Sequence, residues 1–174
     1  MRRFLIGPIP RIILVGLFAM SLQRAVFAQH PLGDIKLQFV LALVATAGAV
    51  GGADRGAVAG FALGLMYDFS GNTPLGLTAL AYGIGGIVAG SLQSFTPEGQ
   101  WWFASLWTLA GAAVGELAVP FEEVVTGEPG WLSGRLLVEV PVVAVAAAVM
   151  SPALMPVARW MVAVKRKKWK VMTE

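Results

Sequence analysis

Six apolar stretches divide this sequence, and a short connection rich in Gly, Pro, Asn or Asp separates each from the next. They cover approximately residues 12–28, 37–51, 56–69, 74–95, 101–120 and 136–155. A helix rises about 1.5 Å per residue, so about 20 apolar residues cross a hydrocarbon core about 30 Å thick. Because 57% of the residues are hydrophobic and only 13% are charged, we predict an all-α integral membrane protein. Residues 1–174 are expected to form a single transmembrane domain, a six-helix bundle.

The third stretch differs from the others in its length. Residues 56–69 would rise only about 21 Å as a helix, which is about 9 Å less than the hydrocarbon thickness. We therefore expect a short third helix that ends below the outer surface. Non-helical backbone at that depth must be covered by protein, so the polar turn from Ser70 to Pro74 is expected to be sheltered by neighbouring helices.

Glycine recurs every four residues in and before this third stretch, and this spacing places small residues on one slowly turning helix face. Small residues let two membrane helices approach closely, so we predict a tight bundle of the third, fourth and fifth helices. Leu63 is expected to face lipid instead. The packing glycines are Gly52, Gly56, Gly60 and Gly64, then Gly86 with Gly90, and Gly111 with Gly115.

Asp68 occupies the next position on the glycine face, within apolar sequence. One interpretation is structural: its carboxylate accepts the free N–H groups of the turn, while Pro74 begins the next helix. The other is functional, because a carboxylate in a membrane segment is costly and often marks a ligand or partner contact. The sequence leaves both open.

Basic residues are distributed unequally between the two sides of the predicted bundle. Ten of the thirteen Lys and Arg residues fall on the side of the N-terminus, which places both termini in the cytoplasm by the positive-inside rule. The first stretch also has features of a cleavable signal, although Arg24 close to the expected cut favours a retained helix. The basic tail, residues 159–174, carries a cluster from Lys165 to Lys170. This juxtamembrane cluster predicts contact with anionic lipid headgroups and not with nucleic acid, and the same charges are equally consistent with a signal that only fixes the topology.

Residue patterns for catalysis, metal binding or cofactor binding are not found. The single histidine, His30, lies in a predicted outer turn, and there is no cysteine. Glu116 and Glu139 are expected to be structural, Glu139 by pairing with Arg135 one turn earlier. We therefore expect no enzyme activity and no cofactor.

The run from Gly60 to Gly90, "GFALGLMYDFSGNTPLGLTALAYGIGGIVAG", resembles the MreD family of bacterial rod-shape-determining membrane proteins. The resemblance rests on a Gly-Leu-x-x-Asp motif, a polar turn, and a Pro-Leu-Gly motif before an apolar helix. These residues are Gly64, Leu65, Asp68, Asn72, Pro74, Leu75 and Gly76. The high Ala and Gly content and the long connection before Trp131 depart from the family pattern.

The resemblance implies a non-enzymatic scaffold of the cell-elongation complex that builds peptidoglycan at the bacterial plasma membrane. It implies as partners MreC-like and MreB-like proteins and a penicillin-binding transpeptidase with its glycosyltransferase. The implied fold is similar to the substrate-binding subunit of energy-coupling-factor transporters. An alternative function is therefore that of such a vitamin-binding subunit.

Overall fold

The computed structural model describes residues 8–27, 37–70, 75–95, 102–118 and 136–163, and this part of the chain contains helices and no strand. The all-helical prediction is therefore confirmed for the described residues. The elements are α2 (Pro8–Leu22) with a π-helical end η1 (Gln23–Phe27), α3 (Phe39–Gly51), α4 (Ala53–Ser70), α5 (Leu77–Leu92) with a 3-10 end η2 (Gln93–Phe95), α6 (Trp102–Ala118) and α8 (Leu136–Met161).

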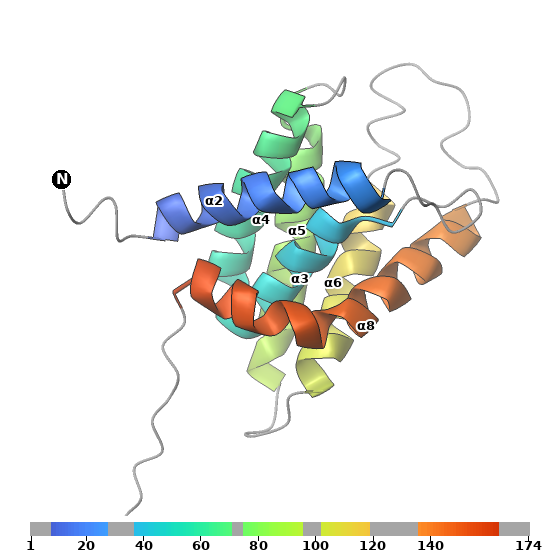
Figure 1. Ribbon diagram of the computed structural model, residues 1–174. Coiled ribbons are helices and arrows are strands. Elements are labelled where there is room, and N and C mark those ends of the chain that lie inside the picture. The colour runs from blue at the N-terminus through green and yellow to red at the C-terminus, as the bar shows by residue number, and fades with distance from the viewer. Residues whose placement is uncertain (1–7, 28–36, 71–74, 96–101, 119–135, 164–174) are drawn as a thin grey trace, which may run out of the picture.

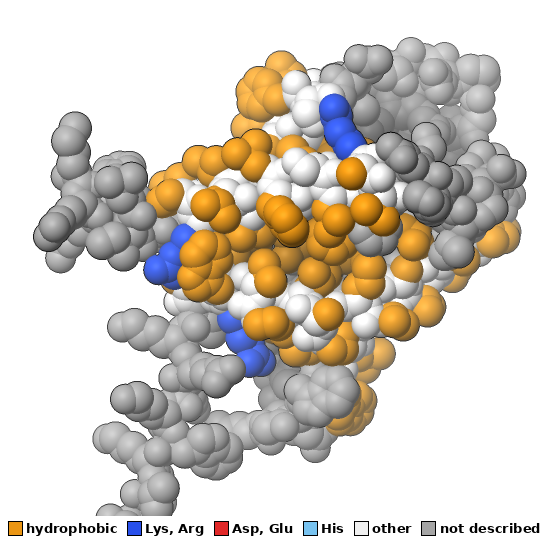
Figure 2. Space-filling model, viewed as in Figure 1, with side chains coloured by type: hydrophobic (Ala, Val, Ile, Leu, Met, Phe, Trp, Pro, Cys, Tyr) orange, Lys and Arg blue, Asp and Glu red, His pale blue; other side chains and the backbone are white. Residues whose placement is uncertain are grey.

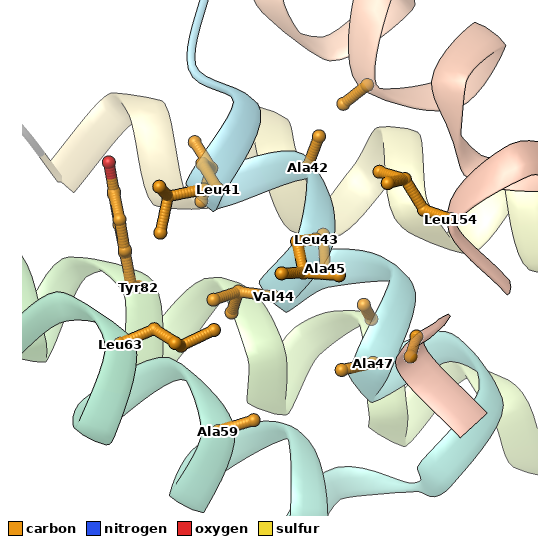
Figure 3. Close-up of a cluster of buried hydrophobic side chains, with 14 of the residues drawn as sticks. Leu41, Ala42, Leu43, Val44, Ala45, Ala47, Ala59, Leu63, Tyr82 and Leu154 are labelled. Atoms are coloured by element: carbon orange, nitrogen blue, oxygen red, sulfur yellow. The ribbon is translucent and has the colours of Figure 1, made fainter. Parts of the chain in front are cut away.

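Helix α3 lies at the centre of the bundle. It contacts α4, α5, α6 and α8, and every residue from Val40 to Val50 is buried. Figure 1 shows α2 and α8 crossing one side of α3, with α4, α5 and α6 on the other side. In the core, side chains of α3 such as Leu41 and Val44 lie beside Leu63 of α4 and Tyr82 of α5 (Figure 3).

The shortest of the six α-helices in the described residues is α3 and not α4, which corrects the predicted short third helix. Helix α3 has 13 residues and α4 has 18, which corresponds to a rise of about 27 Å for α4. The charged residues Asp54 and Arg55 were assigned to a connection, but they form the first turn of α4. An aspartate is favourable there because the N-terminus of a helix carries partial positive charge. The connection is reduced to Gly52, whose φ of 89° is accessible mainly to glycine.

The outer surface of the described bundle is strongly apolar. Exposed large side chains recur on several helices, including Leu14 and Phe18 on α2 and Val149 on α8. Figure 2 shows hydrophobic side chains spread across one face of the molecule. Polar side chains such as Thr46, Thr108 and Ser151 are instead buried. Two of the described helical segments, Ile9–Val26 and Leu136–Met161, are long and apolar enough to cross a membrane, and α3 is a shorter apolar helix.

Helices α4 and α5 run antiparallel in direct backbone contact. A Cβ atom at Gly56 would collide with the carbonyl of Gly86, and one at Gly60 would collide with the carbonyl of Tyr82. Each step of four residues along α4 is thus matched by a step of about four residues back along α5. Glycine on this face allows a separation that any larger residue would prevent.

The same close approach continues on both sides of this helix pair. Gly48 of α3 also lies against the Gly86 carbonyl, so three helices meet where Gly48, Gly56 and Gly86 come together. On the other side of α5, a Cβ at Gly85 would lie 2.7 Å from the carbonyl oxygen of Gly111 in α6. The structure therefore places α5 between α4 and α6 with glycine on both contact faces.

Leu63 is fully buried, which corrects the expectation that it faces lipid. The glycine face of α4 is covered by α5, and the adjacent face that carries Leu63 is covered as well. Its Cδ2 atom would lie 2.6 Å from a Cβ atom at Gly16, so α2 packs over this part of α4. Spacing within α4 could not reveal this second covering helix.

Helix α8 contains Pro141, Pro152 and Pro156 and changes direction along its length (Figure 1). Proline cannot donate a backbone hydrogen bond and bends the helix that contains it. Ser151 directly precedes Pro152, and its hydroxyl lies 3.1 Å from that of Thr108 on α6. The two buried hydroxyls satisfy each other and hold α8 against α6.

Candidate functional site

Asp68 lies at the end of the glycine face of α4 and is 2% exposed. Its Oδ2 atom accepts hydrogen bonds from the backbone N–H of Gly76, at 2.8 Å, and of Ala79, at 3.3 Å. Gly76 is the residue before the first turn of α5, and Ala79 is the third residue of that helix. The carboxylate therefore caps α5 from the last turn of a neighbouring helix.

This cap replaces one that α5 cannot provide for itself. Gly76 stands at the N-cap position with φ 98° and has no side chain that could accept a hydrogen bond. The first N–H groups of a helix have no partner within the helix, and its N-terminus favours negative charge. Asp68 satisfies two such groups and supplies that charge.

Gly64 and Asp68 lie one turn apart on α4, and both contact the start of α5. A Cβ at Gly64 would lie 2.5 Å from Cα of Ala79 and 2.6 Å from the carbonyl oxygen of Thr78. The close approach at Gly64 brings the start of α5 within reach of the short Asp68 side chain. The structure thus brings together Gly64, Asp68 and Gly76, three residues of the motif identified in the sequence.

The other motif residues occupy different positions. Leu65 is half-buried on α4, and Leu75 is 65% exposed just before α5. Asn72, Pro74 and most of the predicted polar turn lie outside the described residues. Asp68 bonds to Gly76 and Ala79, just beyond the turn, and its predicted bonds to residues 71–74 lie outside the described residues.

A second side chain stabilises the end of α4. The guanidinium of Arg24, in η1, donates to the backbone carbonyl of Ser70. The last carbonyls of a helix lack partners within the helix and carry partial negative charge. Arg24 therefore caps α4 close to the point where Asp68 caps α5.

Two glutamines, Gln23 (buried) and Gln38 (half-buried), connect η1, the start of α3 and α5 at the same end of the bundle. Gln23 accepts from the N–H of Phe39 at 2.6 Å and donates to the carbonyl of Leu37 at 2.9 Å. Gln38, beside them, accepts from the hydroxyl of Tyr82 at 2.8 Å. The ring of Tyr82 lies 6.2 Å from that of Tyr67, one residue before Asp68. The hydrogen bonds join the start of α3 to η1 and α5, and the ring contact links Tyr82 to α4.

The remaining acidic candidates occupy separate positions. Glu116 is buried on α6, whereas Glu139 lies in the first turn of α8, where negative charge is favourable. Arg135, its predicted partner, and His30 lie outside the described residues. Among the described residues, no three His, Cys, Asp or Glu side chains gather as a metal site would require.

Several residues of this site were not identified from the sequence. Gly48 lies four residues before Gly52, so the glycine spacing already included it. The prediction that Gly52 lies on a helix face is wrong, because Gly52 lies between α3 and α4. Arg24, Gln23, Gln38 and Tyr82 carried no local signal, because their partners lie 14 to 46 residues away.

Comparison of the chain with protein-family models, with curated proteins and with solved structures finds no match.

Proposed function

We propose that this chain is a non-enzymatic integral membrane scaffold of a bacterial cell-elongation complex. The observation that carries the proposal is the link between α4 and α5, in which Gly64 permits close contact and Asp68 caps the helix that begins after Gly76. These are the residues on which the resemblance to the MreD family rests. A closely packed helix pair is suited to holding partner proteins in a defined arrangement.

The apolar exterior supports the membrane location of the proposed scaffold. In water an exposed apolar surface of this extent would favour aggregation, whereas in a bilayer it faces hydrocarbon. Arg11 and Arg24 lie at different ends of the bundle. Arg11 lies against Trp160 near the end of α8, whereas Arg24 lies at the C-terminal end of α4.

We predict six membrane crossings with both termini in the cytoplasm. Reporter domains inserted after Lys170 and at Arg55 should give cytoplasmic signals, whereas a reporter at Gly127 should give an external signal. Alkaline phosphatase and a fluorescent protein, used in parallel at each site, provide opposite readouts. An external signal after Lys170 is incompatible with six crossings.

The proposed partners are MreC-like and MreB-like proteins and a penicillin-binding transpeptidase with its glycosyltransferase. The test is purification of the intact complex in mild detergent from the native cell, followed by mass spectrometry of co-purifying proteins and small molecules. We expect cell-wall synthesis proteins in excess over a control purification of another multi-pass membrane protein that carries the same tag.

A vitamin-binding transporter subunit is the second candidate function. The cluster of Gln23, Gln38, Tyr82 and Asp68 at one end of the bundle favours it, because ligand pockets need convergent polar groups. However, each of these side chains forms hydrogen bonds that join helices of this chain. Co-purification of a vitamin or of a pair of ATPase subunits, without cell-wall proteins, would support the transporter and reject the scaffold.

A further inference from the structure

We infer that the end of the bundle where α2 begins and α8 ends binds the headgroup phosphate of an acidic phospholipid. The inferred site depends on the membrane location proposed above and is independent of the cell-elongation role. It consists of Arg11, Arg55, Arg159 and Trp160, from three helices.

Arg11 and Trp160 form the centre of this site. The guanidinium carbon of Arg11 lies 5.3 Å from the centroid of the Trp160 ring, and its Nη1 atom donates to the Trp160 carbonyl at 3.3 Å. These contacts hold the planar guanidinium in one orientation, and an arginine has further N–H donors that can bind a phosphate. Trp160 is 48% exposed, and tryptophan is enriched at the membrane–water interface.

Two more arginines belong to the same end of the bundle. Arg159 precedes Trp160 and is exposed. Arg55 is also exposed, and its Cβ would lie 3.3 Å from a Cβ atom at Gly51, which would itself lie 3.0 Å from Val162. The start of α4 is therefore next to the end of α8. Of the four acidic residues among those described, only Asp54 belongs to this end, so positive charge is in excess.

A lipid fits this site better than a free anion because apolar surface begins beside the charges. Ile9 and Ile13 on α2 are 57% and 48% exposed, and Val157 on α8 is 41% exposed. Figure 2 shows Lys and Arg side chains at the edge of a face that is otherwise largely apolar. An acidic phospholipid would place its phosphate among the arginines and its acyl chains along α2 and α8.

Native mass spectrometry can measure lipid retention on the detergent-purified protein with an equimolar mixture of phosphatidylglycerol and phosphatidylcholine. We expect preferential retention of phosphatidylglycerol. Each basic residue near an anionic surface contributes about 1 kcal/mol, so Arg11→Gln and Arg159→Gln should each weaken that retention about fivefold. Arg159 is exposed at the surface, so its replacement changes charge without disturbing a buried contact.

Arg24→Gln is the matched control, because it removes the same charge at a different end of the bundle. Its phosphatidylglycerol retention should equal that of the wild type. The inferred site is wrong if Arg159→Gln retains the lipid normally, or if Arg24→Gln loses it equally. Inorganic phosphate is tested in the absence of added lipid. If phosphate stabilises the protein as much as the lipid does, the site binds a free anion instead.

The two proposals can fail separately. A protein that stays in the aqueous fraction without detergent would contradict the membrane location itself. A membrane-embedded protein that binds both lipids equally would contradict the inferred headgroup site and the predicted lipid contact of the basic tail, but not the membrane location. Loss of rod-shape support has no bearing on lipid retention.

Discussion

Replacement of Gly86 by alanine is expected to lower the free energy of unfolding by about 3 kcal/mol, at the upper end of the range for overpacking. The added Cβ would collide with the carbonyl oxygen of Gly56 and would lie 2.7 Å from its carbonyl carbon. Backbone atoms within a helix cannot move aside as the end of a side chain can. Helices α4 and α5 would have to separate, and the contact of Gly86 with Gly48 in α3 would be lost with them.

Gly83→Ala provides the matched control for this variant. Gly83 is also buried on α5, but the atoms nearest to an added Cβ are the Ala57 oxygen and the Phe61 nitrogen, both at 3.9 Å. That is an ordinary contact distance, and alanine favours a helix over glycine by about 1 kcal/mol. The stability of Gly83→Ala should therefore be unchanged or slightly raised.

Thermal unfolding of both variants in the same detergent checks this expectation. For a chain of this length a loss of about 3 kcal/mol corresponds to a lower midpoint by on the order of 10 °C. Equal midpoints for Gly86→Ala and Gly83→Ala would show that close backbone contact does not hold α4 and α5 together.

Replacement of Asp68 by alanine is expected to lower the free energy of unfolding by about 2 to 3 kcal/mol and to abolish support of rod shape. The N–H groups of Gly76 and Ala79 would lose their acceptor, and a buried unsatisfied donor costs about 1 to 3 kcal/mol. The start of α5 would also lose a negative charge that is favourable at a helix N-terminus. Asp68→Asn keeps an acceptor oxygen and should lose about half as much stability.

Two measurements on the same variants separate the structural and functional roles of Asp68. One is thermal stability in detergent, and the other is restoration of cell shape in a strain that lacks the protein. If Asp68→Asn is as stable as the wild type and yet fails to restore shape, the charge itself contacts a partner. Wild-type behaviour of Asp68→Ala in both assays would falsify both interpretations.

Asp54→Ala is the control for loss of an aspartate from α4. Asp54 is exposed in the first turn of that helix, where its interaction with the helix dipole is worth about 0.5 kcal/mol. We expect a small loss of stability and normal cell shape. A loss as large as that of Asp68→Ala would show that the buried position of Asp68 is not what matters.

Sequence spacing predicted which face of α4 makes close contact. The four-residue repeat of Gly56, Gly60 and Gly64 is a local property of one helix, and a helix presents residues four apart on one side whatever lies opposite. The predicted start of α4, residue 56, is wrong because hydropathy does not detect where a helix begins. Hydropathy assigned Asp54 and Arg55 to a connection, whereas a helix begins where its hydrogen bonds begin, here directly after Gly52.

By itself the sequence determined the helical class, the small-residue face of α4 and the presence of a carboxylate at the end of that face. Each of these follows from residues within about one or two helical turns of one another. The tertiary structure decided which groups meet: Gly48 with Gly86, Tyr82 with Gln38, and Arg24 with Ser70. It also decided that Leu63 is buried and that Asp68 binds the start of α5. These pairings depend on the direction, register and crossing of separate helices, and no local repeat encodes those quantities.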